Sequence, residues 1–203
     1  MKKIALFLLV SILTVSSAQA ENGLTFGLAV GTAGQEYSDA FTDVAGISSV
    51  SARDTSMGIR MGIPISRYAL LEGAIYDYGE ANDDYFDTFG DLISVKLSTT
   101  SINFGMAAIL PISYTPTEFI GRIGLALWDA EVEFRDSSLP GQVLADEDNG
   151  VAIYLGVGAR TSITRNVKLG LEYTFFGFDT NFTDVAGEQY IDNFALTLDV
   201  GFY

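Results

Sequence analysis

The stretch Phe194–Tyr203, FALTLDVGFY, shows the pattern on which the whole chain is built. Its large apolar residues occupy every second position, and Ala195, Thr197, Asp199 and Gly201 stand between them. Alternation with a period of two is typical of a β-strand with one apolar face and one small or polar face. In a strand that crosses a bilayer, the apolar face contacts lipid and the other face lines the interior of a barrel.

Seven earlier segments repeat this alternation, namely 24–31, 57–63, 69–76, 102–108, 119–128, 151–160 and 167–175. The sequence therefore predicts an all-β fold, an eight-stranded antiparallel up-and-down β-barrel that crosses a membrane. Leu70 and Ile120 are exceptions, because they are apolar residues on the side assigned to the interior. Residues 95–100 fit the phase of their strand poorly, which predicts a bulge or an exit from the membrane there.

The connections between these segments alternate in length. Short connections are expected at 64–67, 111–117 and 164–166, and long loops at about 33–52, 79–94, 129–149 and 179–192. Bacterial barrels have short turns at the periplasmic side and longer loops outside. The four long stretches hold most of the carboxylates and one base, Arg135. The sequence therefore predicts acidic loops that lie in water.

The N-terminus has the features of a secretion signal. Lys2 and Lys3 precede an apolar run over 4–15, and Ala18-Gln19-Ala20 has the small-x-small form of a cleavage site. The run is shorter than the ~20 residues that a membrane-spanning helix needs. We expect a signal peptide over 1–20 and a barrel domain over 21–203.

Composition excludes several kinds of chemistry. The chain has 26 acids, 11 bases and a net charge of −15, which disfavours a nucleic-acid partner. It contains no Cys and no His, so it has no disulfide, no thiolate and no imidazole to act as a base near neutral pH. A carboxylate pair could still act as in glycosidases, but no placement favours one. The sequence predicts no cofactor and no enzymatic activity.

Seven charged residues fall on the interior side of the strands: Arg60, Glu72, Arg122, Arg160, Lys168, Glu172 and Asp199. Eight strands enclose a space that side chains can just fill, and charges buried there need partners. Two interpretations stay open: a packed ionic core, or a gate whose ion pairs exchange to open a narrow channel. Tyr76, Tyr78, Trp128 and Tyr154 share this side and favour a filled lumen.

The signal peptide, the eight alternating strands and the aromatic C-terminus resemble small outer-membrane barrels of the OmpA-transmembrane, OmpX and opacity-protein type. The resemblance implies an integral protein of the bacterial outer membrane, monomeric and in contact with outer-membrane lipids and lipopolysaccharide. It also implies a non-enzymatic surface protein that presents four acidic loops, with an envelope-structural or adhesion role. The alternative is a low-conductance porin for small solutes.

The acidic loops supply candidate ligands for divalent cations, because Ca²⁺ prefers several carboxylate and carbonyl oxygens. The candidates are Asp43, Asp83, Asp84, Asp87, Asp146, Glu147, Asp148 and Asp184. The hexamer Phe-Thr-Asp-Val-Ala-Gly occurs at 41–46 and again at 182–187. A closed barrel would make these two loops neighbours. Either a function of the two loops, or a duplication or loop conversion without function, would account for the repeat.

Overall fold

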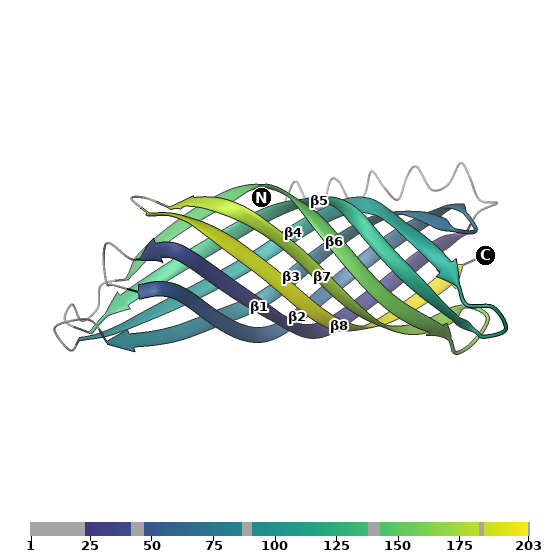
Figure 1. The fold of residues 1–203 in the computed structure, drawn as a ribbon, viewed down its shortest axis with the longest axis horizontal. Helices are drawn as coiled ribbons and strands as arrows, with labels where there is room; N and C mark the ends of the chain where they lie inside the picture. Colours follow the sequence, from purple (N-terminus) through teal and green to yellow (C-terminus); the bar gives the residue numbers. More distant parts are fainter. Residues whose placement is uncertain (1–22, 42–46, 87–90, 138–142, 183–184, 203) are drawn as a thin grey trace.

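Eight antiparallel strands form a closed barrel in the computed structural model, which describes residues 23–41, 47–86, 91–137, 143–182 and 185–202. Each strand pairs with the next along the chain, and β8 pairs with β1 (Figure 1). The strands are β1 Leu24–Phe41, β2 Ile47–Ser66, β3 Ala69–Phe86, β4 Leu92–Pro111, β5 Thr117–Asp136, β6 Leu144–Ser162, β7 Val167–Phe182 and β8 Val185–Phe202. No helix in the described part of the chain is long and apolar enough to cross a bilayer. The predicted barrel is confirmed.

An apolar belt runs around the barrel and covers about half of its length. On β6, the outward residues Val151, Ile153, Leu155 and Val157 are each more than half exposed, as lipid-facing side chains would be. The belt ends at the next outward position, Asn149. The same step from an apolar to a polar outward residue occurs at nearly the same level on neighbouring strands, at Asp77, Thr100 and Asp129. Each strand therefore offers lipid about the 9–11 residues that a tilted strand needs to cross a bilayer.

The strands are longer than this belt. They run for 16 to 20 residues, and the surplus lies at one end of the barrel. We call this the loop end, and the opposite end, which carries the short turns at 67–68, 112–116 and 163–166, the turn end. The prediction of long loops was wrong, because the strand pairing continues as far as Phe41 with Ile47, Phe134 with Leu144 and Phe182 with Val185. Those stretches are mainly strand.

The reason for this error lies in how the polarity of the strands changes outside the belt. On β4, Val95 and Leu97 are buried inside the barrel, whereas Lys96 faces outward between them. Above the belt the exterior is wet and the interior is packed, so the apolar and polar faces exchange places relative to the lipid-facing part. The poor phase over 95–100 therefore marks an exit from the membrane.

The bulge that was the alternative for residues 95–100 lies instead on the partner strand. The register of β3 against β4 shifts between Asp77 and Glu80, and Gly79 has a positive φ of 76° that other residues rarely adopt. The Asp54 carboxylate accepts backbone N–H bonds from Glu80 at 2.8 Å and from Thr55 at 2.7 Å. These two bonds lower the pKa of Asp54.

Candidate functional site in the barrel interior

Charged side chains gather inside the turn-end half of the barrel. The seven residues singled out from the sequence all lie on inward positions: Arg60 on β2, Glu72 on β3, Arg122 on β5, Arg160 on β6, Lys168 and Glu172 on β7, and Asp199 on β8. All except Lys168 are less than 8% exposed. The lumen here is therefore an ionic layer enclosed by the lipid-facing wall.

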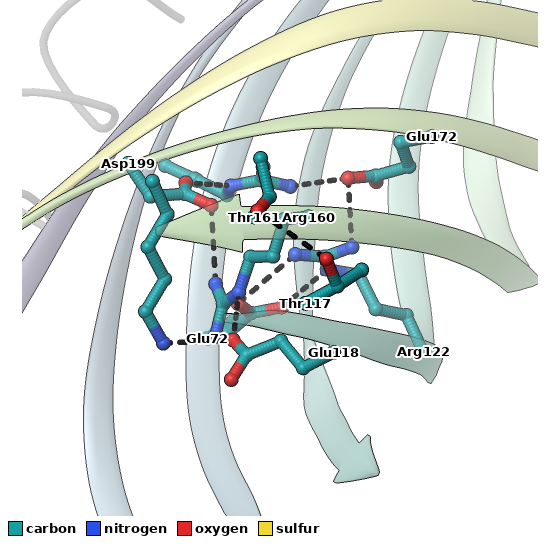
Figure 2. A network of polar contacts seen from close by, with 10 residues as sticks. Glu72, Thr117, Glu118, Arg122, Arg160, Thr161, Glu172 and Asp199 are labelled. Atoms are coloured by element: carbon teal, nitrogen blue, oxygen red, sulfur yellow. Dashed lines mark hydrogen bonds and ion pairs between the residues drawn. The ribbon is translucent and has the colours of Figure 1, made fainter. Parts of the chain in front are cut away.

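These side chains form one continuous series in which acids and bases alternate (Figure 2). Arg122 joins Glu72 and Glu172, at 2.7 Å each. Arg60 joins Glu172 at 2.6 Å and Asp199 at 3.0 Å. Because each of these groups has ionic or charge-assisted partners, the cost of burying its charge is offset.

The series continues toward the turn end through Arg160, which joins Asp199 at 3.1 Å and also pairs with Glu118. Glu118 in turn accepts from Lys168 Nζ at 2.8 Å. We call this series the ion chain. Its eight residues, in order of contact, are Glu72, Arg122, Glu172, Arg60, Asp199, Arg160, Glu118 and Lys168.

Glu118 was not among the lumen residues predicted from the sequence. It adjoins the predicted turn over 111–117 and was therefore not assigned to a face. Its phase could have identified it, because it is two and four residues before Ile120 and Arg122, which both point inward. With Glu118 included, the ion chain has four acids and four bases, so the formal charges of the layer balance.

Glycines make room for the large side chains of the lumen. Gly58 is the strand partner of Tyr76, and a Cβ at Gly58 would lie 2.4 Å from the tyrosine ring. Gly150 is the strand partner of Trp128, and a Cβ at Gly150 would lie 2.7 Å from the indole ring. Gly27 is the strand partner of Arg60, and a Cβ at Gly27 would lie 2.6 Å from the arginine side chain. The small residues of the inward face are therefore a steric requirement of the ionic and aromatic layers.

An aromatic layer lies next to the ion chain, on the side of the loop end. Tyr76, Tyr78, Phe176, Phe178 and Trp128 form a continuous series of ring contacts with centroids 4.0 to 5.8 Å apart. All five side chains are buried. Such contacts add to the free energy of burying the rings. The layer fills the cross-section that a water-filled channel would need.

Polar residues cross the lumen beyond the aromatic layer. The Thr99 hydroxyl donates to Gln35 Oε1 at 2.9 Å, and the Gln189 amide donates to Thr99 at 3.2 Å. Gln35 also donates to the carbonyl oxygen of Gly79 at 3.1 Å. Thr99, Gln35 and Gln189 are fully buried. The lumen is thus filled on both sides of the aromatic layer.

The candidate cation ligands are distributed differently from the prediction. Asp83 and Asp84 are adjacent in β3, so they fall on opposite faces of the wall. In β6, Glu147 points outward and is exposed, whereas Asp146 and Asp148 fall on the inward face. Burial, followed by the charges of Asp148 and Asp146, raises the pKa of the inward Tyr37.

The described residues contain no group of three His, Cys, Asp or Glu side chains that could hold a metal ion. Asp43, Asp87 and Asp184 lie outside the described residues, as do the predicted signal peptide, residues 42–46 of the first hexamer and residues 183–184 of the second. Within the described lumen, the buried acids are held by arginine or lysine partners. The geometry therefore offers no positive sign of catalysis.

The closed barrel, its apolar belt and its filled interior define an integral β-barrel of the outer-membrane type. Residues 5–202 match the family described as outer membrane protein beta-barrel domain, and the chain belongs to that family. No curated protein matches the chain.

Solved structures are similar to the chain in fold. The crystal structure of Neisserial surface protein A is 14% identical, covers 87% of this chain and 97% of that chain, and gives a TM-score of 0.51. Ail, the attachment invasion locus protein of Yersinia pestis, crystallised with the heparin analogue sucrose octasulfate, is 12% identical with a TM-score of 0.47 and covers 87% and 99% of the two chains. Membership of the outer membrane beta-barrel family, matched over residues 5–202, identifies the protein as an integral protein of the outer membrane.

Proposed function

We propose that the protein is a non-enzymatic surface protein whose filled barrel anchors acidic loops and the wall that leads to them. The observation that supports this proposal is the filling of the lumen. Between the ion chain and the aromatic layer, the described residues line a cavity with a volume of only about 10 Å³, which is room for about one water molecule. A barrel filled in this way serves as an anchor, and its function resides at the loop end.

The outer wall at the loop end carries charges that do not favour folding. Glu131 stands directly opposite Glu147, and Asp179 directly opposite Glu188. Like charges that face each other across a strand pair destabilise a sheet. Their presence outside the belt supports a role in solvation or recognition, because this arrangement adds nothing to the stability of the barrel.

Divalent cations are a proposed partner of this acidic wall and its loops. Salt screens charges over about 8–10 Å, and a bound Ca²⁺ would relieve the repulsion further. In protease-protection experiments, Ca²⁺ should protect the loop end and a chelator should reverse the effect. Equal protection by sodium at matched ionic strength would reduce the effect to screening.

Conductance is the experiment that tests the filled barrel. The refolded protein is inserted into planar bilayers, next to a known porin as a positive control for the measurement. The expected result is no reproducible conductance step. Discrete steps whose size or ion selectivity changes in the Glu172→Gln variant would contradict the proposal, because such a change locates the current in this lumen.

The second candidate is a low-conductance porin, and one observation favours it. Glu118, Glu172 and Asp199 each accept from two bases. An acid that is already shared can keep one partner while it releases the other, so ion pairs could exchange without a fully unpaired charge. The conductance experiment distinguishes the two candidates.

A further inference from the structure

A cavity opens at the turn end of the barrel, below the ion chain. Its volume is about 320 Å³. We call it the vestibule, and its lining includes Arg67, Glu118, Arg160, Lys168 and Asp199. Deeper in the lumen, a cavity lined by Arg60, Arg122 and Glu172 among the described residues has a volume of only about 10 Å³. The vestibule is therefore a pocket at one end of a filled lumen.

The charged lining of the vestibule is positive overall. Three bases, Arg67, Arg160 and Lys168, face two acids, Glu118 and Asp199. Both acids are already shared: Glu118 accepts from Arg160 and Lys168, and Asp199 also serves Arg60, which lies deeper in the lumen. The vestibule therefore has more positive charge than its own carboxylates neutralise.

Two of these bases have donor capacity left over. Within the described chain, Lys168 Nζ pairs with Glu118, although an ammonium group has three N–H donors. The Arg67 guanidinium lies over the face of the Tyr68 ring, 4.4 Å from its centroid. Both side chains can therefore donate to a bound anion without breaking a contact that the structure contains.

The wall of the vestibule also has an apolar part. Leu70 and Ile109 line it, and they pack with Ala107 and Ile120 in a buried apolar cluster. Leu70 and Ile120 are the two residues that did not fit the polar interior expected from the sequence. Pro64 lies at the same wall. A ligand that fits the whole lining would have an anionic group and a short apolar part.

We propose that the vestibule binds the phosphate group of an anionic amphiphile. Phosphate offers several acceptor oxygens to a lysine ammonium and an arginine fork, the two groups that proteins use most to hold it. The volume is near the lower limit of about 300 Å³ for small-molecule sites, so a head group and a few carbons fit and long acyl chains do not. The phosphate could belong to a phospholipid of the adjacent leaflet or to a soluble phosphate compound.

Titration of the full chain, refolded in uncharged detergent micelles, tests the proposal. One series uses inorganic phosphate and the other dihexanoyl phosphatidylglycerol, with heat of binding and the amide signals of Arg67 and Asn166 as readouts. We expect saturable binding of at least one probe. Binding of the phospholipid about tenfold or more tighter than inorganic phosphate, about 1.4 kcal/mol, assigns the lipid source. Comparable affinities assign a soluble phosphate compound.

Variants locate the site. Lys168→Gln should weaken binding about tenfold and Arg67→Gln several-fold, because each loses a charge-assisted contact. Arg67 lies in an exposed turn, so its variant remains informative if Lys168→Gln does not fold. Arg135→Gln, at the loop end, is the matched control and should bind as the wild type does. The proposal is overturned if neither probe saturates, if chloride at equal ionic strength gives the same signal changes, or if all three variants bind alike.

Discussion

Glu172 links two buried arginines of the ion chain, Arg60 and Arg122, and its neutralisation gives a sharp prediction. Its Oε2 accepts from Arg60 Nη1 at 2.6 Å and from Arg122 Nη1 at 2.7 Å, and the side chain is 4% exposed. Glu172→Gln keeps the shape of the side chain and removes its charge. Two buried guanidinium groups, those of Arg60 and Arg122, then each lose one of their acidic partners. The ion chain is left with four bases and three acids.

The expected cost follows from what each arginine retains. Removal of one partner of a buried ion pair typically costs about 3–5 kcal/mol. Arg60 keeps Asp199 and Arg122 keeps Glu72, so neither charge is left alone. We therefore expect the lower limit, a loss of about 3 kcal/mol in the free energy of unfolding. That loss corresponds to a change of more than a hundredfold in the unfolding equilibrium.

Urea unfolding in lipid vesicles measures this loss, followed by the difference in gel migration between folded and unfolded protein. The matched control is Glu147→Gln, the same chemical change on the exposed outer wall. It removes one of two facing carboxylates, Glu147 opposite Glu131, and should leave stability unchanged or slightly higher. Equal unfolding midpoints for wild type and Glu172→Gln would refute the assignment of Glu172 to a coupled ion chain.

Three further predictions test the wall. Gly58→Ala should lower the unfolding free energy by about 1–3 kcal/mol because its Cβ overlaps a tyrosine ring 2.4 Å away, whereas Gly121→Ala has nothing within 4 Å and should be neutral or stabilising; equal losses would contradict the steric account. The folded-state pKa of Asp54 lies below 3.8, so its contribution is present above that pH and is lost as the pH falls through the folded pKa. Stability measured against pH should therefore fall less steeply on acidification in Asp54→Asn, and identical profiles would count against it. Leu155→Arg, in the lipid belt, should cost about 2–4 kcal/mol and Asn149→Arg, above it, about 0–1 kcal/mol in vesicle unfolding assays; the reverse order would move the membrane boundary.

The period of two was enough to predict the barrel and the face of nearly every charged lumen residue. Arg122 and Glu172, for example, stand between apolar neighbours that can only face lipid, so their own side had to be the interior. The same reasoning could not give the ion pairs. Lys168 is the strand partner of Asp199, yet it pairs with Glu118 on β5. Long side chains reach across a narrow lumen, so neighbours in the sheet do not decide the pairing.

The length of the strands could not be predicted by assigning apolar residues to the outer face and acidic stretches to loops. Above the belt, Val132 is buried inside while Glu131 and Glu133 face out, so the alternation persists with its polarity exchanged. The change of environment from lipid to water, rather than a loss of strand structure, explains the acidic character of these stretches.

Spin labels along β6 test the continuous strand most directly. The chain has no cysteine, so single cysteines placed from 144 to 157 carry the labels without interference, and collisions with oxygen and with a nickel chelate are measured in vesicles. The account predicts oxygen-dominated collisions at Val151, Ile153, Leu155 and Val157, a change to nickel-dominated collisions at Asn149 and Glu147, and a period of two throughout. Uniformly mobile, nickel-accessible labels from 144 to 150 without alternation would show a loop there and contradict the extended barrel.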